Sequence, residues 1–421
     1  MVCVIMAGGR GTRIASVRSD IPKPMIPVLG KPILEYQVIS LRRQGIVDFV
    51  LCIGYLGEVI RSYFGDGSRW GVRISYIEEQ EPLGTAGALF YLKGRIQDNF
   101  LLVNGDLVFD VDVKRFLAYH QAKRATVTIM THPNSHPYDS GLIFANADGR
   151  VAKWLHKEDE RLWYHNRVNA GIHLISPRIF SQFAKVKKTD LDREILRPLI
   201  GRGELFAYDT PEYIKDMGTP DRYAQVAKDL ESGMVERKNL SHPQKAIFLD
   251  RDGTINKMVG FLTHIDDFEL LPGVAKAIRK INDSGYLAIV ITNQPVIARG
   301  QLSYEGLEEI HMKMETLLGR EGAYIDDLFF CPHHPDSGFP GEVRELKMDC
   351  ECRKPKPGMI FNARDKYHID LSRSYMIGDQ KRDEETAINA GCKGYRIGKA
   401  ECLGIASVSS LLEAVEEILG V

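Results

Sequence analysis

Two short apolar segments of the chain each end directly in a polar loop. Residues 2–7 (VCVIMA) lead into a glycine-rich loop at 8–11, and residues 246–249 (AIFL) lead into DRDGT at 250–254. A glycine-dense turn after a strand lets backbone N–H groups approach a phosphate closely, and paired carboxylates at a strand end can act on one. The chain therefore predicts two α/β units that both handle phosphate groups.

Apolar strand segments alternate with amphipathic helical segments in both halves of the chain. This alternation predicts an α/β fold in which mostly parallel sheets carry helices on both faces. The expected strands are 2–7, 48–53, 73–77, 100–103, 125–130, 168–175, 245–250, 286–291, 325–330, 374–377 and 394–397. The expected helices are 33–43, 84–93, 112–123, 190–200, 219–231, 272–284, 303–319, 357–367, 381–391 and 407–418. A polar, aperiodic stretch interrupts the pattern, so we expect two doubly wound domains at 1–232 and 245–421, joined by a linker at 233–244.

Composition narrows the class of partner. The 421 residues contain 55 Lys and Arg against 56 Asp and Glu, which gives no bias towards nucleic acid or an acidic membrane. The N-terminal apolar stretch is too short for a signal peptide, and seven cysteines do not suggest a disulfide scaffold. We expect a cytoplasmic protein with small-molecule substrates and neither a nucleic-acid nor a membrane partner; homo-oligomerisation is left open.

Three cations accompany the first loop. Arg10, Arg13 and Lys23 are suited to a triphosphate whose leaving pyrophosphate gathers negative charge. The loop lacks the third glycine of the dinucleotide fingerprint, and no Gly-Lys-Ser/Thr closes it as a Walker A motif requires. A nucleoside triphosphate bound by neither of these motifs is therefore expected.

Further segments of the first half predict a base pocket and a metal site. The small-residue turn at 81–87 opens a helix, where a flat base can lie against the backbone. Asp106 follows a strand and Asp216 precedes a helix. Two such carboxylates could hold the Mg²⁺ that accompanies nucleotide phosphates.

Together these segments, over roughly 1–230, resemble the sugar-1-phosphate nucleotidyltransferases. The resemblance implies a Rossmann-like domain in which a sugar phosphate attacks the α-phosphorus of a nucleoside triphosphate and expels pyrophosphate. It makes Arg13 and Lys23 the catalytic cations, with Asp106 and Asp216 as Mg²⁺ ligands. By the same resemblance, the nucleotide would be bound by Gly8, Gly9, Gly11, Thr12, Glu81, Gly84 and Thr85. The sugar phosphate would be bound by Gly141, Lys157, Asn169 and Gly171.

Two departures from that family's pattern bear on the substrate. Residues 15–17 (ASV) stand where the family has Pro-Leu-Thr, and residues 156–158 (HKE) stand where it has Glu-Lys-Pro. In the family, the Glu that is absent here contacts hydroxyl groups of the sugar. The reaction class is therefore expected to hold, whereas the motif leaves the sugar open.

The second half carries paired carboxylates at a strand end. Asp250 and Asp252 are separated by one residue, so that one can attack phosphorus while the other protonates the leaving oxygen and later activates water. Thr292 and Asp379 end two further expected strands, where open α/β sheets bind their ligands. Lys354 supplies a cation for the phosphate.

These pieces resemble the haloacid dehalogenase-type phosphatases over about 244–400. The resemblance makes Asp250 the nucleophile and Asp252 the general acid/base. Mg²⁺ would be held by Asp250, Asp379 and the backbone carbonyl of Asp252. The phosphate and the rest of the substrate would be held by Thr292, Asn293, Arg353 and Lys354.

An irregular stretch at 331–356 has the spacing of a zinc loop. It contains Cys331, the pair His333 and His334, and then Cys350 and Cys352. Three thiolates and one imidazole form a closed tetrahedral zinc set, and a metal would pin a loop of this length. The chemistry of the ligands does not decide between the two histidines.

The zinc loop and residues 353–355 (RKP) resemble the branch of histidinol-phosphate and heptose-bisphosphate phosphatases. That likeness selects His333 as the ligand beside Cys331, Cys350 and Cys352. Removal of the phosphate at carbon 7 from D-glycero-D-manno-heptose 1,7-bisphosphate leaves a sugar 1-phosphate, which is what the first family consumes. The pairing implies a bifunctional enzyme that makes heptose 1-phosphate and then GDP-heptose from GTP.

Two other interpretations stay open on the sequence. One joins a mannose- or glucose-1-phosphate nucleotidyltransferase to a histidinol-phosphate-type phosphatase. The other, of a different class, is a regulatory protein that senses sugar nucleotides, although the retained Arg13, Lys23, Asp106 and Asp216 argue against an inactive site. The base, the anomer and any direct transfer of the intermediate between the two sites are also left open.

Overall fold

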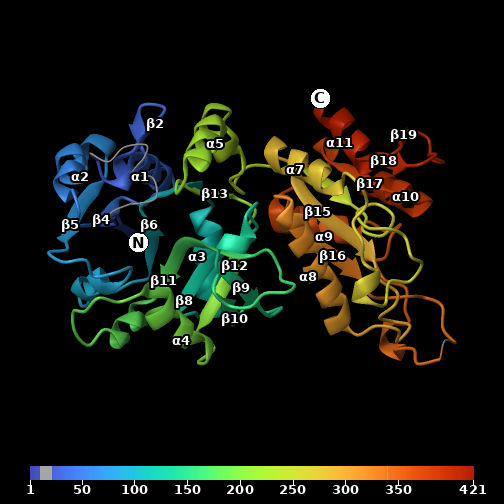
Figure 1. Cartoon of the computed structure of the whole chain (residues 1–421), viewed down its shortest axis with the longest axis horizontal. Coiled ribbons are helices and arrows are strands. Elements are labelled where there is room, and N and C mark those ends of the chain that lie inside the picture. Colours follow the sequence, from blue (N-terminus) through green and yellow to red (C-terminus); the bar gives the residue numbers. More distant parts are fainter. Residues whose placement is uncertain (10–20, 339) are drawn as a thin grey trace. The chain divides into compact units, whose positions relative to one another are not determined.

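The computed structural model describes residues 1–9, 21–338 and 340–421, which form two compact units (Figure 1). The first unit comprises Met1–His132, Ile143–Leu155 and Asn169–Asn239. The second comprises Pro133–Leu142, His156–Val168 and Leu240–Val421. Two short segments from the first half of the sequence therefore group with the second half.

The first unit is built on a nine-stranded sheet in which β10-β9-β11-β6-β1-β4-β5 form the main path and β8 and β12 extend it. These strands are β1 (Val2–Met6), β4 (Asp48–Ile53), β5 (Arg73–Glu78), β6 (Phe100–Asn104), β8 (Val127–His132), β9 (Leu142–Ala145), β10 (Val151–Leu155), β11 (Val168–Ile175) and β12 (Leu205–Asp209). Two small ladders pair β2 (Pro27–Val28) with β3 (Lys31–Pro32) and β7 (Leu107–Asp110) with β13 (Tyr213–Asp216). The helices are α1 (Ile33–Arg43), α2 (Gly57–Phe64), α3 (Val113–Lys123), α4 (Arg197–Ile200), α5 (Pro220–Glu231) and α6 (Met234–Arg237).

Alternate side chains of the central strands face two separate cores. Cys3 and Ile5 of β1 pack with Leu34 of α1 on one face of the sheet. Val4 packs with Leu89 and other apolar side chains on the opposite face. Because side chains of a strand alternate in direction, a continuous apolar strand is covered on both faces, as the doubly wound pattern predicted.

The sheet of the first unit contains antiparallel pairs as well as parallel ones. β1 pairs in parallel with β4 and β6, but β11 runs antiparallel to β6 and to β9. A parallel connection needs a long crossover that usually contains a helix, and no helix lies between β9 and β11.

Three local expectations are corrected. The segment 84–93 forms a 3₁₀ helix at Gly87–Leu92, and 190–200 begins as a π-helix at Leu191–Leu196 before α4. Residues 234–237, expected within a polar linker, form α6, because Met234 and Val235 are buried in an apolar cluster of the first unit.

The second unit is built on a six-stranded, wholly parallel sheet with the order β16-β15-β14-β17-β18-β19. These strands are β14 (Ala246–Leu249), β15 (Leu287–Asn293), β16 (Asp327–Cys331), β17 (Tyr375–Gly378), β18 (Lys393–Ile397) and β19 (Ala406–Val408). The helices are α7 (Val274–Ser284), α8 (Tyr304–Arg320), α9 (Gly358–Tyr367), α10 (Lys381–Ala390) and α11 (Leu411–Leu419). The order of strands reverses at β14, and open α/β sheets bind ligands at the carboxyl ends of the strands beside such a reversal.

Segment 156–168 joins the second unit through polar contacts with α8. The ring nitrogens of His165 lie 2.7 Å from Glu315 Oε1 and 2.8 Å from Glu308 Oε1. The backbone N–H of Tyr164 donates to Thr316 Oγ1 at 2.9 Å. These contacts explain why the segment groups with α8 rather than with the strands that flank it in sequence.

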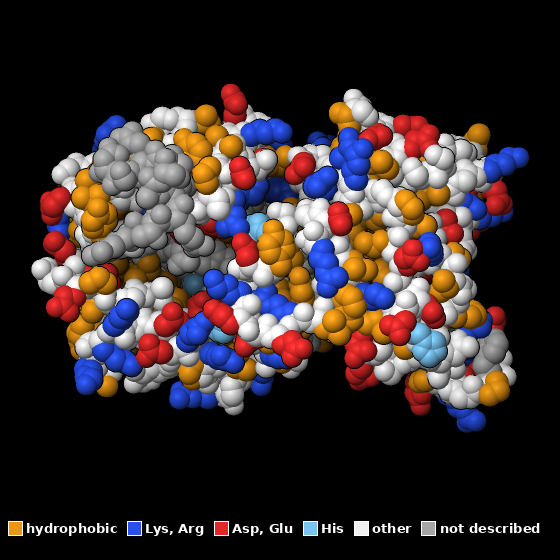
Figure 2. All heavy atoms as spheres, in the orientation of Figure 1, with side chains coloured by type: hydrophobic (Ala, Val, Ile, Leu, Met, Phe, Trp, Pro, Cys, Tyr) orange, Lys and Arg blue, Asp and Glu red, His pale blue; other side chains and the backbone are white. Residues whose placement is uncertain are grey.

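The surface agrees with the balanced composition. On the face in Figure 2, Lys and Arg side chains intermingle with Asp and Glu side chains, in keeping with a formal net charge of -1. Of the helices in the described ranges, none has the length and apolar character needed to cross a bilayer.

Candidate active sites

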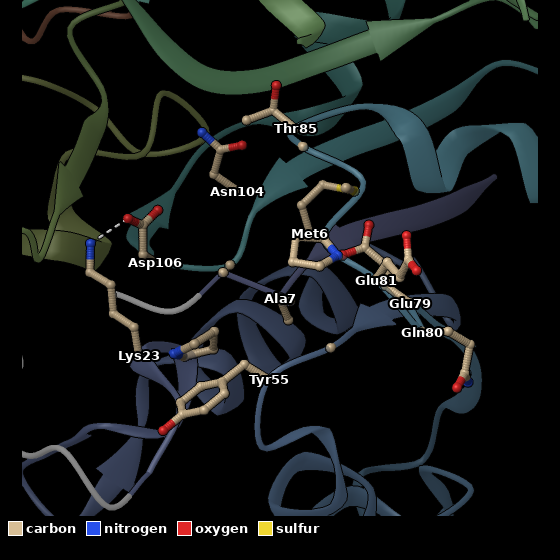
Figure 3. Close-up of a pocket in the computed structure, with 17 residues that line it drawn as sticks. Met6, Ala7, Lys23, Tyr55, Glu79, Gln80, Glu81, Thr85, Asn104 and Asp106 are labelled. Carbon is tan, nitrogen blue, oxygen red and sulfur yellow. Dashed lines mark hydrogen bonds and ion pairs between the residues drawn. The ribbon is translucent and has the colours of Figure 1, made fainter. Parts of the chain in front are cut away.

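A pocket of about 720 Å³ opens beyond the carboxyl end of β1 in the first unit (Figure 3). β1 lies between β4 and β6, and the segments that follow these parallel strands meet at the pocket. Of the predicted residues, those that line it are Gly8, Gly9, Lys23, Glu81, Gly84, Thr85 and Asp106. The predicted residues Gly11, Thr12 and Arg13 lie outside the described residues.

Lys23 and Asp106 form an ion pair in this pocket (Figure 3). The Lys23 side chain is only 10% exposed, so the charge pair is partly shielded from water. Since a lysine ammonium is a compact point charge, Lys23 is suited to binding a phosphate oxygen.

Asp216 lies next to Asp106 because β7 and β13 form a ladder. The N–H of Met217 donates to the carbonyl of Asp106 at 3.2 Å. Burial opposes ionisation of Asp216, but the Arg222 guanidinium, 2.9 Å away, holds the pKa of Asp216 below its usual value. The two predicted Mg²⁺ ligands are therefore neighbours, and their carboxylate oxygens are the donors that Mg²⁺ prefers.

The predicted base-facing turn is fixed by backbone geometry. Gly84 has φ of +78°, and a Cβ there would lie 2.5 Å from the carbonyl oxygen of Thr189. Glycine is required at such a position. Thr85 Oγ1 accepts a hydrogen bond from the N–H of Leu191 at 2.7 Å, which holds the turn against residues 189–191.

The predicted sugar-binding residues fall into two groups. A Cβ on Gly171, where φ is +73°, would lie 2.5 Å from Nδ2 of Asn104, a lining residue of the pocket. Asn169 Oδ1 accepts from the N–H of Gly171 at 3.1 Å, so both residues lie beside the pocket. Gly141 and Lys157 belong to the segments grouped with the second unit, and the lining of the pocket does not include them.

The second site lies beyond the carboxyl end of β14 and is built on a buried ion pair. Lys354 Nζ lies 2.8 Å from Asp250 Oδ1 and 2.7 Å from Asp383 Oδ1. Burial, followed by the charge of Asp383, raises the pKa of Asp250 to about 7. Asp383 also accepts the N–H of Gln380 and so caps α10, which fixes its position.

Asp252 differs from Asp250 in its surroundings. Burial opposes its ionisation, but the charge of Arg251 and hydrogen bonds from Asn256 and Gln294 hold the pKa of Asp252 below its usual value. Two carboxylates two residues apart therefore have pKa values shifted in opposite directions. In this arrangement Asp250 is held towards its protonated form and Asp252 is held ionised, so a role of Asp252 as general acid requires it to take up a proton first.

The remaining predicted phosphatase residues surround Lys354. Thr292 is buried at the end of β15. Asn293 forms two hydrogen bonds of 3.0 Å with the backbone of Lys354, so it positions that lysine. The side chain of Arg353 donates to the carbonyl of His333 at 3.0 Å and thereby joins the site to the cysteine-rich loop.

Three carboxylates of this site could hold a divalent cation. Ligand atoms of Asp250, Asp379 and Asp383 all lie within 4.8 Å of one another. Oδ1 of Asp379 is buried and has no hydrogen-bond partner among the described residues. Gly253 has φ of +82°, and a Cβ there would lie 2.2 Å from Asp379, so glycine admits this carboxylate. An oxygen-only set with an unpaired buried atom fits Mg²⁺.

Four side chains of the cysteine-rich loop converge on one point. Ligand atoms of Cys331, His333, Cys350 and Cys352 lie within 4.8 Å of one another, with Sγ···Sγ distances of 3.2 to 3.5 Å. Hydrogen bonding from Cys331 lowers the pKa of Cys352 to about 5, so one thiolate forms readily. Ligands about 2.3 Å from a tetrahedral zinc would be at comparable separations. His333 belongs to this group, whereas the ring of His334 faces Arg299 and Asp336.

Several site residues were not predicted. Glu79 lines the first pocket, and its Oε1 is buried without a hydrogen-bond partner in the described part of the chain. Asp383, Arg251 and Gln294 belong to the second site. The sequence shows Asp383 four residues after Asp379 and Gln294 directly after Asn293, but it assigned neither residue a role. Glu79 and Arg251 give no sequence signal for a role, because their roles depend on which side chains fold against them.

Comparison with known proteins gives two family matches. Residues 2–233 match the family model described as nucleotidyl transferase, and residues 351–399 match the model described as HAD-hydrolase-like. The chain is 43% identical over 150 residues to the D-glycero-beta-D-manno-heptose-1,7-bisphosphate 7-phosphatase of Escherichia coli K12, covering 35% of this chain and 76% of that protein.

One further relative and one solved structure each match slightly more than half of this chain. The mannose-1-phosphate guanylyltransferase of Mycobacterium tuberculosis is 29% identical over 234 residues, covering 55% of this chain and 65% of that protein. The crystal structure of HddC from Yersinia pseudotuberculosis has 27% identity and a TM-score of 0.48, covering 54% of this chain and 99% of that one.

Proposed function

The chain belongs to the nucleotidyl transferase family through residues 2–233 and to the HAD-like heptose-bisphosphate phosphatases through its C-terminal part, and from this premise we propose a bifunctional enzyme of nucleotide-activated heptose synthesis. The C-terminal part removes the phosphate at carbon 7 of D-glycero-D-manno-heptose 1,7-bisphosphate. The N-terminal part transfers GMP from GTP to the resulting heptose 1-phosphate and releases pyrophosphate.

The presence of both families in one chain is the observation that carries this proposal. Loss of the 7-phosphate from a 1,7-bisphosphate leaves a sugar 1-phosphate, and the 29% identical relative is named for acting on a sugar 1-phosphate. The first product therefore has the chemistry of the second substrate. Guanine is proposed because the same relative is named a guanylyltransferase.

In the nucleotidyl transfer, Lys23 and Arg13 bind the triphosphate and stabilise the charge that gathers on pyrophosphate. Asp106 and Asp216 are the residues that would hold Mg²⁺, which neutralises phosphate charge when bound. The turn at Gly84 and Thr85 accommodates the base. Asn169 and Gly171 orient the sugar.

In the phosphatase reaction, a carboxylate oxygen of Asp250 attacks phosphorus. Asp252 gives its proton to the departing sugar oxygen and then takes one from the attacking water. Lys354 and Thr292 bind phosphate oxygens. Asp250, Asp379 and Asp383, with the backbone carbonyl of Asp252, would hold the Mg²⁺ that neutralises the phosphate.

Zinc held by Cys331, His333, Cys350 and Cys352 would be structural, since four protein ligands leave no open position. Thiols of this kind remain available for zinc in a reducing compartment, and all seven cysteines are free. We therefore assign the enzyme to the cytoplasm, with small-molecule substrates.

The proposal is tested by incubating the full chain with heptose 1,7-bisphosphate of each anomer, Mg²⁺ and one nucleoside triphosphate at a time. Inorganic phosphate is expected with or without a nucleotide. Pyrophosphate is expected with GTP, and only after phosphate has begun to appear. A much faster consumption of a hexose 1-phosphate than of heptose 1-phosphate would overturn the heptose assignment.

The mannose-1-phosphate relative supports a second candidate, a mannose-1-phosphate guanylyltransferase joined to an unrelated phosphatase. Mannose 1-phosphate and heptose 1-phosphate should be compared at equal concentration with GTP. A preference for mannose 1-phosphate together with hydrolysis of histidinol phosphate would favour that candidate.

A further inference from the structure

Asp252 is surrounded by hydrogen-bond donors on both carboxylate oxygens. The guanidinium of Arg251 lies 2.9 Å from Oδ1 and 2.8 Å from Oδ2, and Asn256 Nδ2 lies 3.0 Å from Oδ1. Gln294 Nε2 completes the group at 2.9 Å from Oδ2. Since an ionised carboxylate offers about four lone-pair positions, this set leaves little acceptor capacity unused.

Gln294 has a second contact that the other donors lack. The same Nε2 atom lies 2.8 Å from Oγ1 of Thr292, the hydroxyl proposed to bind the phosphate. A carboxylate can only accept, so the amide nitrogen, not the amide oxygen, must face Asp252, and its two protons serve the two neighbours. Gln294 is 2% exposed, and its backbone N–H donates to the carbonyl of Cys331 at 2.7 Å, which fixes the residue.

The direction of this hydrogen bond decides what Thr292 can do. Because Thr292 Oγ1 accepts from Gln294, the hydroxyl proton of Thr292 is left to donate to a phosphate oxygen. Without the amide, the hydroxyl could turn its proton to Asp252 or to a backbone carbonyl instead. One amide group thus orients both the hydroxyl proposed to bind phosphate and the carboxylate proposed as acid/base.

We propose that Gln294 is a positioning residue of the phosphatase, which orients Thr292 as a hydrogen-bond donor to the phosphate and holds Asp252 in line with the leaving oxygen. The inference rests on the proposed phosphatase function. Arg251 is its counterpart on the other side of Asp252. Within the described part of the chain Arg251 contacts Asp252 but forms no hydrogen bond with Thr292, and its second contact is with His311 Nε2 at 3.2 Å.

The step that Gln294 serves is the departure of the sugar oxygen. A bond forms between Asp250 Oδ and phosphorus and the bond between phosphorus and the sugar oxygen breaks, while a proton that Asp252 has first taken up from water passes to that oxygen. A sugar alkoxide is a poor leaving group and needs this proton, whereas p-nitrophenolate leaves without it. Displacing Asp252 should therefore harm sugar phosphates more than p-nitrophenyl phosphate.

The test compares Gln294→Met, which keeps length but loses both donors, with Arg251→Met and with the control Gln301→Met. Gln301 is exposed on the same loop and has no predicted role. For each full-length variant, kcat/KM is measured on heptose 1,7-bisphosphate and on p-nitrophenyl phosphate, together with the inhibition constant of inorganic phosphate. The ratio kcat/KM reports the steps up to departure of the leaving group, which is where the two substrates differ.

Gln294→Met should lower kcat/KM on the sugar phosphate by about 10²-fold or more, and by at least about tenfold more than on the aryl phosphate. It should also raise the inhibition constant of phosphate, because Thr292 is no longer oriented. Arg251→Met should reproduce the difference between substrates without the change in phosphate inhibition, and Gln301→Met should show neither. Gln294→Leu, which also lacks both donors, should behave like Gln294→Met and serves if the methionine variant does not fold.

Equal losses on both substrates with unchanged phosphate inhibition would overturn the inference while leaving the phosphatase in place. A wild-type chain that hydrolyses neither substrate would instead overturn the proposed function. The two failures are therefore told apart by the wild-type measurement alone.

Discussion

Lys354 Nζ lies 2.8 Å from Oδ1 of Asp250, and both side chains are nearly inaccessible to water, with 1% and 8% exposed. The backbone of Lys354 is held in turn by the amide of Asn293. A charge buried in this way has a high desolvation cost, which its oppositely charged partners must offset. Removal of Lys354 would therefore leave the buried carboxylate of Asp250 without its compensating charge.

Replacement of Lys354 by methionine should lower the free energy of unfolding by about 3–5 kcal/mol, because Asp250 and Asp383 would lose their shared cation. Urea unfolding at pH 7 measures this. Lys356→Met is the matched control, since Lys356 is partly exposed and pairs with exposed Asp349 and Glu351. Its expected cost is much smaller, because water screens an exposed ion pair. Equal effects of the two substitutions would contradict the view that burial makes the difference.

Asp250→Asn should abolish phosphate release while nucleotidyl transfer from supplied sugar 1-phosphate continues. The variant should fold, because the amide removes the repulsion with Asp383 and Lys354 keeps that partner. Phosphate and pyrophosphate release are measured separately on the same preparation. Loss of both activities would argue against independent catalytic sites.

Lys23→Met should lower kcat of nucleotidyl transfer by about 10²–10³-fold, as expected when one charge-stabilising group is removed. Phosphate release should be unchanged. Lys31→Met is the control, since Lys31 is exposed on β3 and does not line the pocket. Similar losses from both lysines would show that general charge rather than position matters.

Cys350→Ser should strongly reduce the zinc content of the purified chain, and a chelator should do the same to the wild type, because both remove part of a thiolate set. Elemental analysis gives the zinc content, and phosphatase activity should fall with it since Arg353 is bound to the loop through His333. Cys402→Ser is the control, because Cys402 lies outside this cluster. Full zinc occupancy in Cys350→Ser would exclude this ligand set.

The stability of the protein should depend on pH through the charge of His165. Burial alone would lower the pKa of His165, but Glu315 and Glu308 raise it to about 10. A histidine with a raised folded-state pKa gives its full stabilisation below the unfolded value of about 6.5 and loses it as pH rises towards the folded value. The difference in unfolding free energy between wild type and His165→Gln should therefore be largest at pH 6 and shrink between pH 7 and 10, by at most about 1.4 kcal/mol per unit. A difference that grows with pH would contradict this assignment.

Much of the candidate chemistry was accessible from local sequence. Asp250 and Asp252 follow an apolar strand, and Cys331, Cys350 and Cys352 recur at a metal-binding spacing, so the roles proposed for them follow from residue type and distance along the chain. The antiparallel direction of β11 was not accessible, because a strand's apolar pattern is the same in either direction. The sequence also did not predict that 156–168 groups with α8, because this grouping depends on pairs such as His165 with Glu315, which are 150 residues apart.

The amino-acid sequence by itself determined two α/β units, a glycine-rich segment after the first strand, an aspartate pair after a later one and a loop with the cysteine and histidine spacing of a zinc site. Each of these depends on neighbours within a few residues, where strand period, turn chemistry and ligand spacing operate. Only the tertiary structure decided that Asp383 shares Lys354 with Asp250 and that Gln294 joins Thr292 to Asp252. Those relationships arise where parallel strands bring distant loops to one edge of a sheet, and burial there makes the charge of each group depend on its partners.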